Sequence, residues 1–270
     1  MKEVYKENVM VDFKVILKNL HTLPLIFGKI PPLFQKNSEI NISSYNNIKD
    51  VTKSAANAII GINDKIVRPK HPTSDDGTLV FFLNGICTDK RVWEINAKQI
   101  LQYFNFKEVL PLHNPTRGVI PDLLECVSGR NFNIEDTDTF LLYKTLKNAL
   151  SGANKVIVIA HSQGGIIISQ IIEHLHKEDN QYLNKLEVYT FASAADELMC
   201  GKHYAEHYAN NYDYVSRIGV LSYRHEYHGK VFVRKKGCGH LLNVHYLQPF
   251  SKGEFCNGKS KLYTYLKNEG

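Results

Sequence analysis

The chain is 270 residues long with a net charge of +6, and its 43% apolar and 22% charged residues are typical of a globular protein of one large domain or two small ones. No apolar run reaches the roughly 18–20 residues that a membrane-spanning helix needs, and no arginine-rich or lysine–aromatic pattern indicates a nucleic-acid surface. The five cysteines are widely spaced and the first residues lack a secretory signal, so the sequence predicts a reduced, cytoplasmic protein.

The first seventy residues differ from the rest. They hold 11 Lys/Arg against 6 Asp/Glu, a net charge of +5, which leaves +1 for the other 200 residues. Apolar residues recur there at the spacing of an amphipathic helix, at Val9, Phe13, Ile16, Leu17 and Leu20. We expect residues 1–70 to form a helical and irregular extension, and residues 71–270 to form the main domain. The extension either packs over that domain or makes peripheral contact with an anionic membrane.

From Thr78 onward, strand and helix patterns alternate along the chain. Strands are predicted at 79–83, 108–113, 156–159, 186–192, 204–209 and 230–235. Helices are predicted at 92–104, at 138–150, directly after residue 164, at 242–247 and at 259–267. Strands that alternate with helices favour a doubly wound, mostly parallel α/β sheet, here with an N-terminal helical extension.

The most informative segment runs from Lys155 to Gln170 and reads K-V-I-V-I-A-H-S-Q-G-G-I-I-I-S-Q. A β-branched strand leads into a tight turn with Ser162 at its apex, and an apolar helical run follows. This arrangement lifts a serine hydroxyl above a parallel sheet. Ala160 stands where the pattern G-x-S-x-G has its first glycine, and it and Gly164 must stay small for strand and helix to pack closely. We interpret Ser162 as a nucleophile.

A serine nucleophile needs a base that accepts its proton and an acid that orients the base. On a sheet of this kind the acid follows the serine in the chain, and the histidine comes last. Asp213 follows the strand predicted at 204–209, and His240 lies in the glycine-flanked turn G-C-G-H-L-L after the last strand. We predict Asp213 as the acid and His240 as the base. Asp196 stays open as an alternative acid, and His245 as an alternative base.

An oxyanion that develops on the substrate needs two backbone N–H donors. The residue after the nucleophile, Gln163, supplies one. The loop that follows the strand at 79–83 begins with Asn84 and Gly85, and the sharp turn that glycine permits makes Ile86 the candidate for the second donor.

Metal chemistry finds little support in the sequence. The histidines and the cysteine between residues 225 and 245 form a loose cluster, without the tightly spaced ligand pairs of zinc sites. We expect neither a metal nor an organic cofactor.

Five segments together resemble the α/β-hydrolase superfamily, in particular its lipase-like serine esterases: L-V-F-F-L-N-G-I, I-A-H-S-Q-G-G, V-Y-T-F-A-S-A-A-D, H-Y-A-N-N-Y-D-Y-V and G-C-G-H-L-L. The third and fourth of them, with the acid of the fourth some twenty residues after V-Y-T-F, are similar to the corresponding stretch of the class 3 lipases. The resemblance covers about residues 78–250. It implies Ser162, Asp213 and His240 as a catalytic triad, with Ile86 and Gln163 as oxyanion donors.

The resemblance also implies a function, a serine hydrolase that cleaves carboxylic esters of lipid or other small acyl substrates. Thioesterases, peptidases and acyltransferases use the same residues, so the sequence leaves the reaction within this class open. A hypothesis from another class is a non-catalytic protein of the same fold that binds a lipid or a partner.

Overall fold

The computed structural model describes residues 14–45, 47, 49–50, 52–53, 76–85, 88–112, 137–179, 181–255 and 258–267. Its centre is a six-stranded sheet with the order β2-β1-β3-β4-β5-β6. The strands are β1 (Thr78–Leu83), β2 (Leu110–Pro111), β3 (Lys155–His161), β4 (Leu186–Phe191), β5 (Tyr204–Tyr212) and β6 (Lys230–Cys238). All five neighbouring pairs are parallel, which confirms the predicted fold class.

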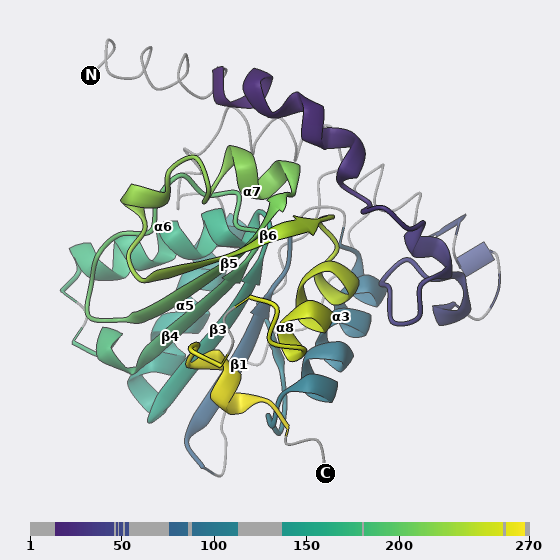
Figure 1. Ribbon diagram of the computed structural model, residues 1–270. Coiled ribbons are helices and arrows are strands. Elements are labelled where there is room, and N and C mark those ends of the chain that lie inside the picture. The colour runs from purple at the N-terminus through teal and green to yellow at the C-terminus, as the bar shows by residue number, and fades with distance from the viewer. Residues whose placement is uncertain are drawn as a thin grey trace.

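Helices cover both faces of the sheet because its central strands are apolar on both sides. In β1, Phe81 and Leu83 belong to the core shared with α5 (Thr137–Gly152) and α6 (Gly164–Lys177). The alternate residues, Val80 and Phe82, belong to the second core. That core is completed by α3 (Lys90–Tyr103), the π-helix η6 (Leu242–Leu247) and α8 (Gln248–Ser251). Figure 1 shows α5 and α6 on one side of the sheet and α3 and α8 on the other.

The strand order reverses next to β1. The chain leaves β1 for the edge strand β2 and returns on the other side of β1 as β3, so β1 and β3 form a topological switch point. Ligands of open parallel sheets bind in the crevice at the carboxyl ends of such strands. The pairing of Leu83 with Ala160 brings the end of β1 beside the turn that carries Ser162.

Residues 14–45, which we call the N-terminal strap, run along the outside of the domain (Figure 1). The strap is helical at 14–19 and then forms three short 3-10 helices, η1 (Leu20–Leu25), η2 (Pro32–Phe34) and η3 (Ile42–Ser44). Prolines prevent a longer helix, since they lack the N–H that α-helical pairing requires. η1 contacts α7 (Tyr214–Ile218). No helix in the part of the chain that the structure describes is long and apolar enough to cross a membrane.

The helix predicted at 259–267 is wrong. Only the 3-10 turn η7 (Leu262–Tyr265) forms there. The N–H groups of Lys261 and Leu262 donate instead to the buried carboxylate of Glu206, at 2.9 and 3.2 Å. These tertiary hydrogen bonds replace the helical pairing that the local sequence favours.

Candidate active site

Ser162 occupies a strained turn directly after β3. Its φ of 58° lies in the left-handed region, which non-glycine residues adopt at a cost of roughly 1–3 kcal/mol. Backbone hydrogen bonds hold the turn, because the N–H of Ser162 donates to the Phe191 carbonyl at 3.0 Å and its own carbonyl accepts from Gly165 and Ala194 at 2.9 and 3.1 Å. The hydroxyl is therefore fixed at the switch point of the sheet.

Two glycines allow the chain to approach this turn closely. A Cβ at Gly164 would lie 2.6 Å from the carbonyl oxygen of Leu83, and one at Gly85 would lie 2.6 Å from the Cβ of Ser162. Both positions therefore require the absence of a side chain. Ala160, in contrast, is fully buried in the core of β3, which accommodates its methyl group.

The imidazole of His240 lies over the serine. Its Nε2 is 2.9 Å from the Oγ of Ser162, within reach for proton transfer. The backbone of His240 is held from both sides: its N–H donates to the carbonyl of Ile26 in the strap at 2.8 Å, and its carbonyl accepts from Nε2 of His161, also at 2.8 Å.

Asp213 follows β5 directly and caps the amino end of α7, where its Oδ1 accepts the N–H of Val215 at 3.0 Å. Its two oxygens lie 3.1 and 3.0 Å from Nδ1 of His240. Because a carboxylate only accepts, Nδ1 carries the proton and Nε2 is free to accept one from the serine. Two hydroxyls complete the shell of Asp213, that of Tyr246 at 2.5 Å and that of Ser216 at 3.0 Å.

The charges around His240 follow from burial and hydrogen bonding. Burial by itself would raise the pKa of the Asp213 carboxyl, but the charge of His240 and the donated hydrogen bonds lower it below its usual value. Asp213 is therefore ionised at neutral pH. Burial lowers the pKa of His161 to about 3 and that of His245 to about 4. Both neighbouring imidazoles are consequently neutral at the pH values where hydrolysis would be measured.

The alternative acid and base occupy other positions. Asp196 lies half-buried in the loop after β4, while the carboxylate in contact with His240 is that of Asp213. His245 lies in η6, and its Nδ1 accepts the N–H of Leu241 at 3.0 Å. That hydrogen bond orders the segment that carries His240.

Of the two expected oxyanion donors, the structure describes Gln163 but not Ile86. Gln163 is the N-cap of α6, so its backbone lies at the amino end of a 14-residue helix, where the peptide dipoles favour negative charge. Ile86 lies outside the described residues. The preceding residue, Gly85, touches Ser162 as described above, so the loop after β1 reaches the serine.

Sequence reasoning did not identify the supporting residues Tyr246, Ser216 and Glu39. A signal existed for Ser216, because an aspartate three residues before a serine at a helix start is typical of a cap. Tyr246 and Glu39 are distant from Asp213 and His240 in the chain, and no local pattern points to them.

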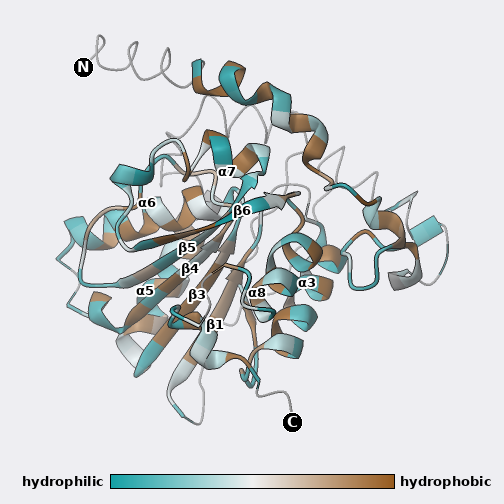
Figure 2. Ribbon diagram, viewed as in Figure 1, coloured by the Kyte–Doolittle hydropathy of each residue, from teal (hydrophilic) through white to brown (hydrophobic). Residues whose placement is uncertain are grey.

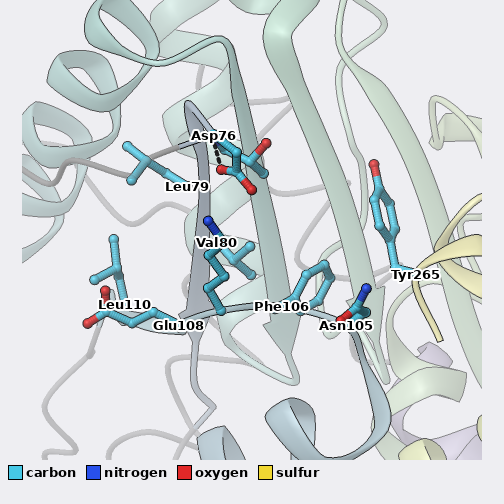
Figure 3. Close-up of a pocket in the computed structure, with 10 residues that line it drawn as sticks. Asp76, Leu79, Val80, Asn105, Phe106, Glu108, Leu110 and Tyr265 are labelled. Carbon is cyan, nitrogen blue, oxygen red and sulfur yellow. Dashed lines mark hydrogen bonds between the residues drawn. The ribbon is translucent and has the colours of Figure 1, made fainter. Parts of the chain in front are cut away.

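A separate pocket lies at the other end of the sheet. It lies beside the amino-terminal half of β1 (Figure 3). Its volume is about 670 Å³. Asp76, Glu108, Phe106 and Tyr265 are among its lining residues. Because it flanks the start of β1, whereas Ser162 follows the end of β3, it is not part of the candidate active site.

No protein-family model and no curated protein sequence matches the chain. Among solved structures it is similar to an arylesterase, with 10% identity over 80% of this chain and 92% of the other and a TM-score of 0.44. It is also similar to dienelactone hydrolase from Anabaena variabilis, with 11% identity over 71% and 89% of the chains and a TM-score of 0.35. A mutant of the esterase rPPE matches 95% of this chain and 98% of its own, with 10% identity and a TM-score of 0.43.

Proposed function

We propose that this protein is a serine hydrolase that cleaves carboxylic esters of lipids or other small acyl compounds. The observation that carries the proposal is the continuous series of hydrogen bonds from Ser162 through the imidazole of His240 to Asp213. A serine hydroxyl without an adjacent base is a weak nucleophile at neutral pH, and this arrangement supplies the base and its orienting acid.

The proposed reaction has two halves. Ser162 Oγ forms a bond to the ester carbonyl carbon while its proton passes to Nε2 of His240. The N–H of Gln163, together with that of Ile86, stabilises the oxyanion, and the alcohol leaves with the proton from His240. Water then attacks the acyl-enzyme with His240 again as the base, and Ser162 is released. Throughout, Asp213 keeps the Nδ1 tautomer and stabilises the imidazolium.

The preference for acyl substrates rests on the surroundings of the base. The strap holds the backbone of His240 through the carbonyl of Ile26, and the neighbouring Phe27 is 55% exposed. Exposed apolar surface on the segment that holds the base is compatible with a substrate that carries an acyl chain.

The test is hydrolysis of p-nitrophenyl esters from C2 to C16, combined with labelling by a fluorophosphonate. We expect Ser162→Ala to lose turnover and labelling while Ser151→Ala, an exposed serine on α5, keeps both. The chain-length optimum then separates esterase from lipase behaviour. Labelling without turnover would direct the assay to thioesters and acyl acceptors. Absence of both in the wild type would overturn the proposal in favour of a binding protein.

A further inference from the structure

In the N-terminal strap, many apolar side chains are exposed, whereas most of the fully buried side chains are polar. Among the described residues, eleven large apolar side chains are exposed, and eight of them belong to the strap: Leu17, Leu20, Leu23, Phe27, Ile30, Leu33, Phe34 and Ile42. Phe34 is 78% exposed and Ile30 65%. Figure 2 shows hydrophobic residues recurring along the strap at the outside of the molecule. Apolar patches of this kind on a folded domain mark interaction sites.

Most of the fully buried side chains of the strap are polar. Its buried residues include Asn19, Thr22, Ser38, Glu39 and Asn41, all at most 6% exposed. Hydrogen bonds hold two of these residues to the domain: Nε of Arg217 donates to Asn19 at 2.6 Å, and the N–H of Asn243 donates to Glu39 at 3.1 Å. Polar contacts therefore help to hold the strap to the domain, while its eight exposed large apolar side chains lie on the outside. For a surface exposed only to water, the opposite distribution is expected.

The charge of this surface is positive. The strap carries four lysines, Lys14, Lys18, Lys29 and Lys36, and its single carboxyl, on Glu39, is buried. No acidic side chain on the strap thus faces outward to balance the lysines.

A basic pocket of about 790 Å³ opens between the strap, the segment after α7 and β6. Four cations, Lys18, Arg217, Arg224 and Lys235, are among its lining residues, and none of the described residues that line it is acidic. None of the four forms an ion pair with a carboxylate among the described residues. The guanidinium of Arg217 donates to the neutral acceptors Asn19 and the carbonyl of Asn211. Within the described part of the chain, the pocket therefore presents positive charge that no carboxylate neutralises.

We propose that the strap and the basic pocket bind the surface of an anionic phospholipid bilayer. The exposed apolar side chains enter the interface, and the pocket receives a phosphate-bearing headgroup. Apolar burial and attraction of lysine and arginine to anionic lipid act together in such binding, and neither alone gives a stable association. Binding at this face brings His240 close to the bilayer, because Ile26 of the strap holds its backbone.

The experiment is co-sedimentation of the full chain with phosphatidylcholine vesicles, with and without phosphatidylserine. We expect binding that requires phosphatidylserine and weakens as salt is raised. The double variant Phe27→Ser/Phe34→Ser should reduce the partition coefficient at least tenfold. Loss of one basic residue should lower the partition coefficient about fivefold. Lys18→Glu/Lys235→Glu should lower it by more than this for each residue, because each substitution also adds a negative charge.

Matched controls come from other surfaces. Phe140 and Leu141 on α5 are exposed to 39% and 44%, so Phe140→Ser/Leu141→Ser removes two exposed apolar side chains from another surface and should leave binding unchanged. Lys98→Glu/Lys252→Glu changes the net charge by the same amount at other exposed positions. Circular dichroism confirms that each variant is folded.

Three results would overturn the proposal. The first is absence of binding to anionic vesicles, and the second is binding that the strap variants leave intact. The third is a concentration-dependent dimer that the same variants abolish, because a second copy of the chain would then cover this face. The binding proposal is separable from the catalytic one, because Ser162→Ala should bind vesicles like the wild type whatever its activity.

Discussion

Replacing Glu39 by glutamine probes a buried carboxyl beside the candidate base. Glu39 is 3% exposed, its Oε1 accepts the N–H of Asn243, and its Oε2 has no hydrogen-bond partner among the described residues. Burial raises its pKa from 4.5 to about 7, although backbone donors and the charge of His240 act in the opposite direction. The folded protein thus favours the protonated form of this side chain.

The magnitude follows from linkage. A carboxyl whose pKa is higher in the folded state than in the unfolded state does not lower the free energy of unfolding below pH 4.5. The reduction grows as the pH rises from 4.5 towards 7 and is complete above 7. At 1.36 kcal/mol for each pKa unit, it reaches about 3 kcal/mol. Glutamine keeps the acceptor for Asn243 and never ionises. The free energy of unfolding of Glu39→Gln should therefore equal that of the wild type near pH 4 and exceed it by about 3 kcal/mol at pH 8.

Urea unfolding at several pH values measures this difference. Trp93, the only tryptophan, is buried and packs 6.0 Å from the ring of Phe82, so its fluorescence follows the loss of the core. Glu94→Gln, at an exposed position on α3, is the matched control and should show no pH-dependent gain. A Glu39→Gln effect that stays constant within about 1 kcal/mol from pH 4 to 8 would show that the folded protein does not disfavour the ionised form of Glu39.

Three further substitutions test the site. Tyr246→Phe removes the 2.5 Å hydrogen bond to Asp213 and should cost about 1–3 kcal/mol of unfolding free energy at pH 7. Because the pKa of Asp213 is depressed, this loss should shrink as the pH falls below 3.8, and urea unfolding at pH 7 and 3 checks both the size and the sign. His161→Phe removes the donor to the His240 carbonyl and should lower kcat roughly tenfold with KM unchanged, so steady-state kinetics with unaltered kcat would contradict that role. Gly164→Ala places a methyl group 2.6 Å from a carbonyl oxygen at the end of β1 and should lower the Tm by several degrees; an unchanged Tm in a thermal melt would argue against the close approach.

Much of the fold follows from local patterns in the chain. Apolar runs such as 79–83 and 156–160 are buried on both faces, and they alternate with helices, so the parallel α/β architecture is confirmed. The turn at Ser162 was also predictable, because strand, serine, small residues and helix lie within sixteen consecutive residues.

The strap shows where sequence reasoning reaches its limit. The helical spacing at Ile16, Leu17 and Leu20 suggests a stripe that packs inward, yet Leu17 and Leu20 are exposed and Asn19 is buried against Arg217. Periodicity indicates that one face is apolar but not which surface, protein or external, that face meets.

Local patterns in the chain are enough to predict the strands, the turn at Ser162 and the types of side chain that could serve as acid and base. The fold brings Asp213 and His240 together, because they follow adjacent strands, β5 and β6, whose register shifts at the bulge between Asn210 and Tyr212. The physical reason is that local patterns depend on neighbours in the chain, whereas hydrogen bonds between distant segments depend on strand order and register.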